Sequence, residues 1–347
     1  MTQRLTQTTA IALAAAALTA GAATAQTVGF LMPDQASTRY EERDYPGFRD
    51  AMAELCPDCE VVYQNANADV QLQQQQFNSL IAQGAEVIVL DPVDSSAAAS
   101  LVNQAQAQDV RVIAYDRPIP DAPADFYVSF DNTGIGRAIA QSLVDHLQAE
   151  GVPDGAGVLQ VNGSPTDAAA GLIRDGIDEA LDGSAYETLA EFDTPNWAPP
   201  EAQSWVSGQI QRFGDDIVGV VAANDGTAGG TIAAFNAAGV EPIPPVTGND
   251  ATIAALQRII AGTQYNTISK PSEIVAEAAA EVANAYIQGE TPEAEMTLYD
   301  TPSQLFTPEV VTRDNIVEII FDGGVNTPEE VCTGEFIEPC RELGIVE

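Results

Sequence analysis

Charged side chains stand directly after one of the most apolar short runs in this sequence. Residues 110–115 are mostly apolar, and Asp116 and Arg117 follow them. Such a run is typical of an inner strand in a sheet that is covered on both faces. Open parallel sheets place their ligands at the carboxyl ends of the strands. A carboxylate beside a guanidinium accepts and donates hydrogen bonds at one place, which suits two neighbouring hydroxyl groups.

Similar side chains stand at equivalent ends of the other predicted strands. Together they supply carboxylates, an amide, guanidinium and ammonium groups and two aromatic rings: Arg39, Tyr40, Asp116, Arg117, Asp167, Trp197, Asn224, Asp250 and Lys270. The oxygens accept hydrogen bonds from hydroxyls, the cations donate them, and an aromatic face covers apolar C–H groups. Any one Asp could simply cap the next helix. The recurrence of the set in both halves of the chain favours a site for a neutral polyol.

The elements that position these residues alternate between strand and helix. Short apolar runs followed by helical patterns of 11 to 14 residues predict βαβ units and a parallel sheet, and the order repeats after residue 150. The first helices of the two halves even share a pattern, FRDAMAEL at 48–55 and IRDGIDEAL at 173–181. The predicted fold class is therefore α/β, with two doubly wound parallel-sheet domains facing a shared cleft.

Two domains of this kind require the chain to cross between them more than once. We expect crossings near residues 131, 263 and 302. The first domain then comprises 26–130 plus 264–301, and the second 131–263 plus 302–347; a strand is predicted at 245–248. A hinge of three segments permits opening and closing of the cleft.

The amino terminus and the charge indicate where such a protein works. Residues 1–25 combine Arg4, an Ala-rich apolar run and Ala-Thr-Ala before Gln26, the pattern of a cleaved signal peptide. No later segment is long and apolar enough to span a bilayer, so we expect a periplasmic protein without a direct membrane anchor. The formal net charge of −38 argues against nucleic acid or anionic lipid as partners.

The four cysteines predict two disulfides in an exported chain. The close spacing favours Cys56 with Cys59 and Cys332 with Cys340. A metal-binding or redox CxxC is the alternative for the first pair, but that pair ends a predicted helix and has no second His/Cys cluster beside it. We therefore expect no metal site and no cofactor.

The sequence lacks the catalytic residues that the alternative enzyme classes would need. The segment TGIGRAIA at 133–140 resembles the end of a dehydrogenase glycine loop, yet the Tyr-x-x-x-Lys pair is absent, because Asn266 stands four residues before Lys270. Asp116 and Asp250 could flank a glycosidic bond, but neighbouring Arg and Lys would keep both ionised and leave no general acid. No catalytic residue is predicted. A sugar-responsive transcription regulator would need a basic helix-turn-helix where this chain has a signal peptide.

Several longer motifs carry a resemblance to a known family. They are AYDRPIPDAPADFYVSFDN (114–132), NGSPTDAAAGLIRDG (162–176), AANDGTAGGTIAA (222–234), TGNDA (247–251), RIIAGTQYNTISKP (258–271) and TPSQLFTPEVV (301–311). The mature chain up to about residue 321 resembles the periplasmic D-xylose-binding proteins of ABC importers, which belong to the ribose, galactose and arabinose class. The Cys-bearing tail lies outside the resemblance.

This resemblance implies a type I periplasmic binding protein fold and a function. The chain would act as a monomer that captures a monosaccharide in the cleft, with D-xylose as the leading candidate. It would close around the sugar and deliver it to an ABC permease. The polar members of the nine-residue set would bind hydroxyls. Tyr40 stands where the family has a Trp, and Trp197 matches its other stacking Trp. Ala168 and Ala169 replace the Asn that follows the aspartate of the family's SPxD motif, which could retune specificity.

Two alternatives stay open from the sequence. The ligand could be another pentose, a hexose or a cyclitol, because the two alanines remove amide hydrogen bonds. The protein could also present its sugar to a membrane sensor or chemoreceptor, alone or in addition to a permease.

Overall fold

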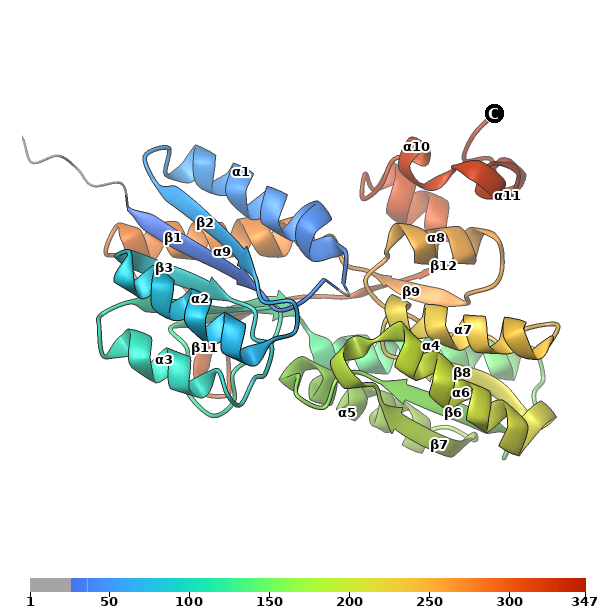
Figure 1. The fold of residues 1–347 in the computed structure, drawn as a ribbon. Helices are drawn as coiled ribbons and strands as arrows, with labels where there is room; N and C mark the ends of the chain where they lie inside the picture. Colours follow the sequence, from blue (N-terminus) through green and yellow to red (C-terminus); the bar gives the residue numbers. More distant parts are fainter. Residues whose placement is uncertain (1–25, 36) are drawn as a thin grey trace, which may run out of the picture.

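The computed structural model describes residues 26–35 and 37–347. The predicted signal peptide, residues 1–25, lies outside this part of the chain. Two lobes lie side by side, each built from a sheet covered by helices on both faces (Figure 1). Within the described residues, no helix combines the length and apolar character needed to cross a membrane.

The first lobe holds a seven-stranded sheet in the order β10-β11-β5-β4-β3-β1-β2. Its strands are β1 (Thr27–Met32), β2 (Glu60–Asn65), β3 (Ala85–Leu90), β4 (Arg111–Tyr115), β5 (Phe126–Phe130), β10 (Met296–Leu298) and β11 (Thr301–Phe306). All neighbours are parallel except β10 and β11, which form an antiparallel pair at the edge. The parallel order places the carboxyl ends of β1, β3 and β4 at one edge of the sheet.

Helices cover both faces of this sheet because successive side chains of its strands point to opposite faces, and both faces are apolar. Phe30 of β1 packs in the cluster of α1 (Tyr45–Leu55) and α9 (Ser272–Ile287), whereas Leu31 packs in the cluster of α2 (Val70–Ala82) and α3 (Ala99–Gln106). Such alternation is the period of two that a strand imposes. The result is a three-layer lobe whose strand ends face the second lobe.

The second lobe repeats the three-layer plan on a smaller sheet. Its strands are β6 (Gly157–Asn162), β7 (Glu187–Asp193) and β8 (Ile217–Ala222), in the order β7-β6-β8, with a separate antiparallel pair of β9 (Asn266–Ser269) and β12 (Glu309–Thr312). Its helices are α4 (Asn132–Ala149), α5 (Ala168–Asp182), α6 (Pro199–Phe213), α7 (Asp225–Ala238) and α8 (Ile253–Ile260). Helices α4 and α5 pack on one face, and α6 and α7 on the other (Figure 1).

The strand pairing differs from the expected crossings at two places. β9 pairs with β12 in the second lobe, and β11 pairs with β5 in the first, so residues 264–269 and 302–306 each lie in the lobe opposite to the expected one. The pairing with β12 places β9 in the second lobe, and the pairing with β5 places β11 in the first. The chain crosses after β5, after β9 and after β11, which gives three crossings.

The strand predicted at 245–248 is reduced to one parallel bridge between Val246 and Val220. Pro244 and Pro245 precede that bridge, and proline has no backbone N–H to extend a ladder. The segment still lies along β8, because the Val220 N–H donates to the Pro245 carbonyl and the Thr247 N–H donates to the Val220 carbonyl.

The cysteines form the two predicted disulfides, Cys56–Cys59 and Cys332–Cys340. The first lies directly after α1. The second holds the carboxyl-terminal segment, with α10 (Pro328–Val331) and α11 (Ile337–Glu342), in an apolar cluster with α8. This segment covers α8 on the second lobe (Figure 1).

Candidate binding cleft

All nine residues of the predicted set line one cavity between the lobes. Five further residues complete its wall: Ser37, Asn132, Ala169, Ile173 and Asn249. The cavity volume is about 30 Å³, which is room for a water molecule or two rather than for a sugar ring. The side chains fill the space because the cations lie against carboxylates across it. A ligand of several heavy atoms can enter only when the lobes separate or these ion pairs rearrange.

Asp116 is the carboxylate on which two cations converge. Its Oδ2 lies 2.6 Å from the Arg39 guanidinium and its Oδ1 lies 3.0 Å from Lys270 Nζ, while the Tyr40 hydroxyl donates to Oδ2 at 3.2 Å. Burial alone raises the pKa of Asp116, but Arg39 and Lys270 outweigh it and hold the pKa well below its usual range. Asp116 therefore stays ionised and can accept hydrogen bonds from a ligand.

The backbone turns sharply at Asp116 to present this side chain. Its φ is 57°, a conformation that costs a residue other than glycine of order 1 kcal/mol or more. The Tyr127 and Ser129 hydroxyls both donate to the Asp116 carbonyl, at 2.8 and 2.9 Å. Trp197 and Asp250 also have positive φ values, 55° and 104°. Three members of the predicted set thus sit on strained backbone that the surrounding structure fixes.

Arg117 points away from its neighbour Asp116 and does not pair with it. The sequence leads us to expect the two side chains side by side. The Arg117 guanidinium lies 2.8 Å from Asp34, 3.4 Å from Asp91 and 3.2 Å from Asp167. The left-handed turn at Asp116 separates the two side chains. Because Asp167 belongs to the second lobe, Arg117 forms an ionic link across the cleft.

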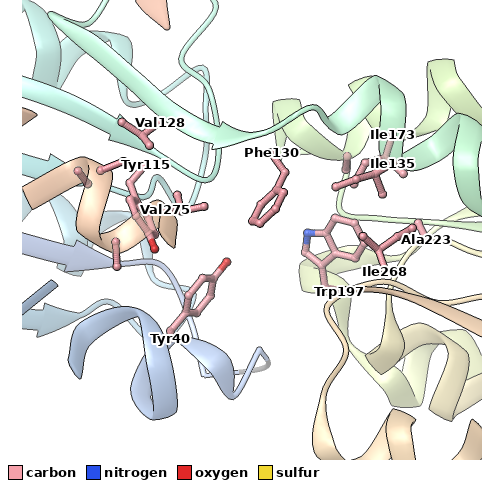
Figure 2. Packing of buried hydrophobic residues seen from close by; sticks show 14 of the residues in the cluster. Tyr40, Tyr115, Val128, Phe130, Ile135, Ile173, Trp197, Ala223, Ile268 and Val275 are labelled. Carbon is pink, nitrogen blue, oxygen red and sulfur yellow. The ribbon is translucent and has the colours of Figure 1, made fainter. Parts of the chain in front are cut away.

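Asp167 caps a helix and also lies in the cleft. Its Oδ1 accepts the Ala169 N–H at 2.8 Å at the start of α5, and its Oδ2 accepts the Trp197 indole N–H at 2.9 Å. The edge of the Trp197 ring packs against Gly163, where any side chain would collide with it. The indole is thus locked with its nitrogen toward the first lobe (Figure 2).

The remaining second-lobe residues supply one donor and one carboxylate. The Asn224 side-chain oxygen accepts the Thr227 N–H at 2.8 Å, which caps α7 and leaves the amide nitrogen as a donor. Asp250 lies 3.6 Å from Lys270, and burial raises its pKa despite that lysine. Lys270 therefore lies between a carboxylate of each lobe, Asp116 and Asp250.

Several cleft residues were not in the predicted set. Asp34 and Asp91 follow strands and hold Arg117, and Asn132 and Asn249 line the cavity; each lies one or two residues from a strand or motif that the sequence marked. Phe130 lies between Tyr40 and Trp197 (Figure 2), with Lys270 Nζ 5.7 Å from its ring centroid. Phe130 ends an apolar strand, and no sequence signal distinguishes it from a core residue.

Direct hydrogen bonds also join the lobes beside the cavity. The Ser95 N–H donates to the Thr166 carbonyl at 3.0 Å, and the Ala168 N–H donates to Ser95 Oγ at 3.1 Å. Thr166 Oγ1 donates to the Val93 carbonyl at 3.4 Å. These bonds exist only when the lobes are in contact, so the conformation described here is a closed one.

Comparison with known proteins gives a family match over most of the chain. Residues 28–291 match the periplasmic binding protein domain. The D-xylose-binding periplasmic protein of Escherichia coli (strain K12) is 35% identical over 279 residues, which cover 78% of this chain and 83% of the relative. The multiple sugar-binding periplasmic receptor ChvE of Rhizobium radiobacter is 29% identical, covering 92% and 96% of the two chains.

A solved structure has the same architecture. The ABC transporter solute-binding protein from Clostridium phytofermentans, with bound β-D-glucose, superposes with a TM-score of 0.80 at 26% identity. The match covers 88% of this chain and all of that chain. The two-lobed arrangement is thus the type I periplasmic binding protein fold.

Proposed function

The chain belongs to the periplasmic binding protein family, and on that premise we propose that it captures a monosaccharide, D-xylose first, between its lobes. It then delivers the sugar to the permease of an ABC transporter. The nine cleft residues are the proposed ligand set, with seven polar side chains binding hydroxyls and Tyr40 and Trp197 covering the ring.

The arrangement around Asp116 carries this proposal. An ionised, buried carboxylate lies between two cations, Arg39 from the first lobe and Lys270 from the second. A sugar hydroxyl placed there can donate to the carboxylate while it accepts from a cation, so both sides of each hydroxyl are satisfied. No histidine or cysteine is among the described residues that line the cavity, and Arg39 and Lys270 keep the Asp116 carboxyl ionised, which suits binding rather than acid catalysis by that residue.

D-xylose is the leading ligand because the two curated relatives named for it are 35% and 32% identical to this chain. The Ala169 side chain lines the cavity where the family pattern has an amide. That change favours a pocket with fewer hydrogen bonds on the α5 side. Another pentose, a hexose or a cyclitol is therefore the alternative ligand.

Binding is coupled to closure of the lobes. We place the domain boundaries near residues 131, 270 and 307, so that β9 belongs to the second lobe and β11 to the first. Each lobe supplies only part of the ligand set, so only the closed form makes all the contacts, and the sugar shifts the equilibrium toward it. The permease would bind the closed surface.

The cellular setting follows from the same premise. The predicted signal peptide of 25 residues and relatives with periplasmic names support a periplasmic location. We propose that the chain works there as a monomer. A relative named as a receptor supports a second role, in which the closed form is presented to a membrane sensor.

A thermal-shift screen of residues 26–347 tests the proposal. Each pentose, D-glucose and myo-inositol would be added in turn, with L-lysine as an unrelated solute. A ligand at 100 times its Kd stabilises the protein by about 2.7 kcal/mol. A shift with D-xylose is the expected result. A shift with only another sugar would overturn the xylose assignment, and no shift with any sugar would overturn sugar capture.

A further inference from the structure

Asp225 is a buried carboxylate that does not line the cavity of the nine-residue set, although it borders a more open pocket beside it, and it collects several hydrogen bonds. It begins α7, directly after Asn224, and is 2% exposed. Its Oδ1 accepts from Gln264 Nε2 at 3.0 Å and from Thr267 Oγ1 at 2.8 Å. Its Oδ2 accepts the N–H and the hydroxyl of Thr252, at 2.8 and 3.1 Å. Four donors converge on one side chain, which only an acceptor-only group can satisfy.

These bonds fix both ends of the loop that carries Asp250. The Asp225 N–H donates to the Asn249 carbonyl at 2.9 Å, and Oδ2 holds Thr252 on the other side. Thr267, itself bonded to Asp225, accepts the Ala251 N–H at 3.1 Å. Every residue from 249 to 252 except Asp250 is thus tied to Asp225 directly or through Thr267.

The loop needs such restraint because its backbone is strained. Asp250 and Ala251 have φ values of 104° and 46°, which side chains other than glycine adopt only when the surroundings enforce them. Gly248 precedes the loop, and a Cβ there would collide with the Asp225 carboxylate and the Gln264 amide. The Asp225 carboxylate thus occupies the space that a side chain at position 248 would need.

We infer that Asp225 is the positioning residue of the binding cleft, which holds Asp250 in its ligand-binding conformation without touching the ligand. This inference rests on the proposed function, since it assigns Asp250 to the ligand set. One buried side chain outside that cavity then sets the position of one carboxylate that the second lobe contributes to the ligand set.

Asp225→Asn tests the inference with almost no change in shape. In either orientation the amide nitrogen faces an obligate donor, the Thr252 N–H or Gln264 Nε2, so the network that holds the loop loses a hydrogen bond. Titration calorimetry with D-xylose at pH 7.5 should give a Kd at least about tenfold higher, the equivalent of ~1.4 kcal/mol. Asp215→Asn, an exposed change on the same lobe, should leave Kd unchanged. A variant Kd equal to that of the parent protein would overturn the inference.

A double-mutant cycle separates positioning from a general effect on stability. In an Asp250→Asn background, adding Asp225→Asn should change Kd by less than about twofold, because the two residues act through one contact. Additive losses would contradict the assigned role. Thr267→Val is a milder variant that removes the link to Ala251 and keeps the carboxylate; it should weaken binding by several-fold.

Hydrogen exchange tests the same inference without any sugar, so its failure can be told apart from failure of the proposed function. In the ligand-free protein, Asp225→Asn should speed exchange of the Ala251 and Thr252 amides and leave β1 and β3 of the first lobe unchanged. Unchanged protection at residues 251–252 would overturn the positioning role, whichever ligand the cleft binds.

Discussion

Neutralising Asp116 while keeping its shape should weaken sugar binding more than any surface change of equal size. In Asp116→Asn, Arg39 keeps its 2.8 Å pair with Asp44 and Lys270 keeps its 3.6 Å pair with Asp250, so neither buried cation is left without a carboxylate. What the variant loses is a charged acceptor held ionised in the cleft. A hydrogen bond to a charged group contributes about 1.5–3 kcal/mol, so Kd should rise roughly 10- to 150-fold.

The assay is titration calorimetry with D-xylose, combined with urea unfolding to show that the variant is folded. Asp121→Asn, an exposed carboxylate of the same lobe, is the matched control and should bind as the parent protein does. Asp116→Ala should in addition destabilise the protein by about 1–3 kcal/mol, because buried donors that Asp116 accepts from, such as the Tyr40 hydroxyl, lose their acceptor. An Asp116→Asn protein with the parent Kd would refute the assignment of Asp116 to the ligand set.

Three further changes test separate parts of the account. Ser95→Ala removes the Oγ that accepts the Ala168 N–H across the cleft and should raise Kd about fivefold, since one hydrogen bond contributes about 1 kcal/mol. Ser100→Ala, an exposed change in the following helix α3, is the control, and equal Kd values for the two would refute the closure link. The chain has two tryptophans, so a sugar-induced fluorescence change should survive Trp205→Phe and disappear in Trp197→Phe, and the reverse pattern would place the ligand elsewhere. Burial raises the pKa of Asp225 from 3.8 to about 6, so between these pH values the native state holds a proton that the unfolded chain releases. The parent protein should therefore gain up to about 3 kcal/mol of unfolding free energy over Asp225→Asn as the pH falls from 7 to below 4, and a pH-independent difference measured by urea unfolding would refute it.

The positions of the cleft residues could be predicted because parallel strands bring their carboxyl ends to one edge of a sheet. Asp116, Asp167 and Asn224 each follow a strand of their own, and the fold alone gathers them. A residue can cap a helix and line the cleft at the same time. Asp167 and Asn224 cap α5 and α7 and also line the cavity. The helix-cap reading of such residues therefore does not argue against a role in a site.

The pairing of charges could not be predicted from the sequence. Asp116 and Arg117 are adjacent, yet the positive φ at Asp116 turns them to different partners. Nothing in the local sequence shows that Asp44 would reach the same cluster and pair with Arg39. Ion pairs between distant segments depend on distances that only the assembled fold fixes.

The lobes to which β9 and β11 belong were predicted wrongly for a similar reason. β9 has four residues and β11 has six, and a segment of that length does not identify its partner strand. Which sheet each joins depends on the open edge available to it, at β5 for β11 and at β12 for β9. Sequence patterns predict that such strands exist but not where they pair.

Titration calorimetry of D-xylose into residues 26–347 at pH 7.5 tests the central claim most directly. We expect saturable heat with one sugar bound per chain, and loss of most of that affinity in Asp116→Asn but not in Asp121→Asn. Absence of binding by D-xylose and by the other sugars of the screen would contradict the claim that this cleft captures a monosaccharide.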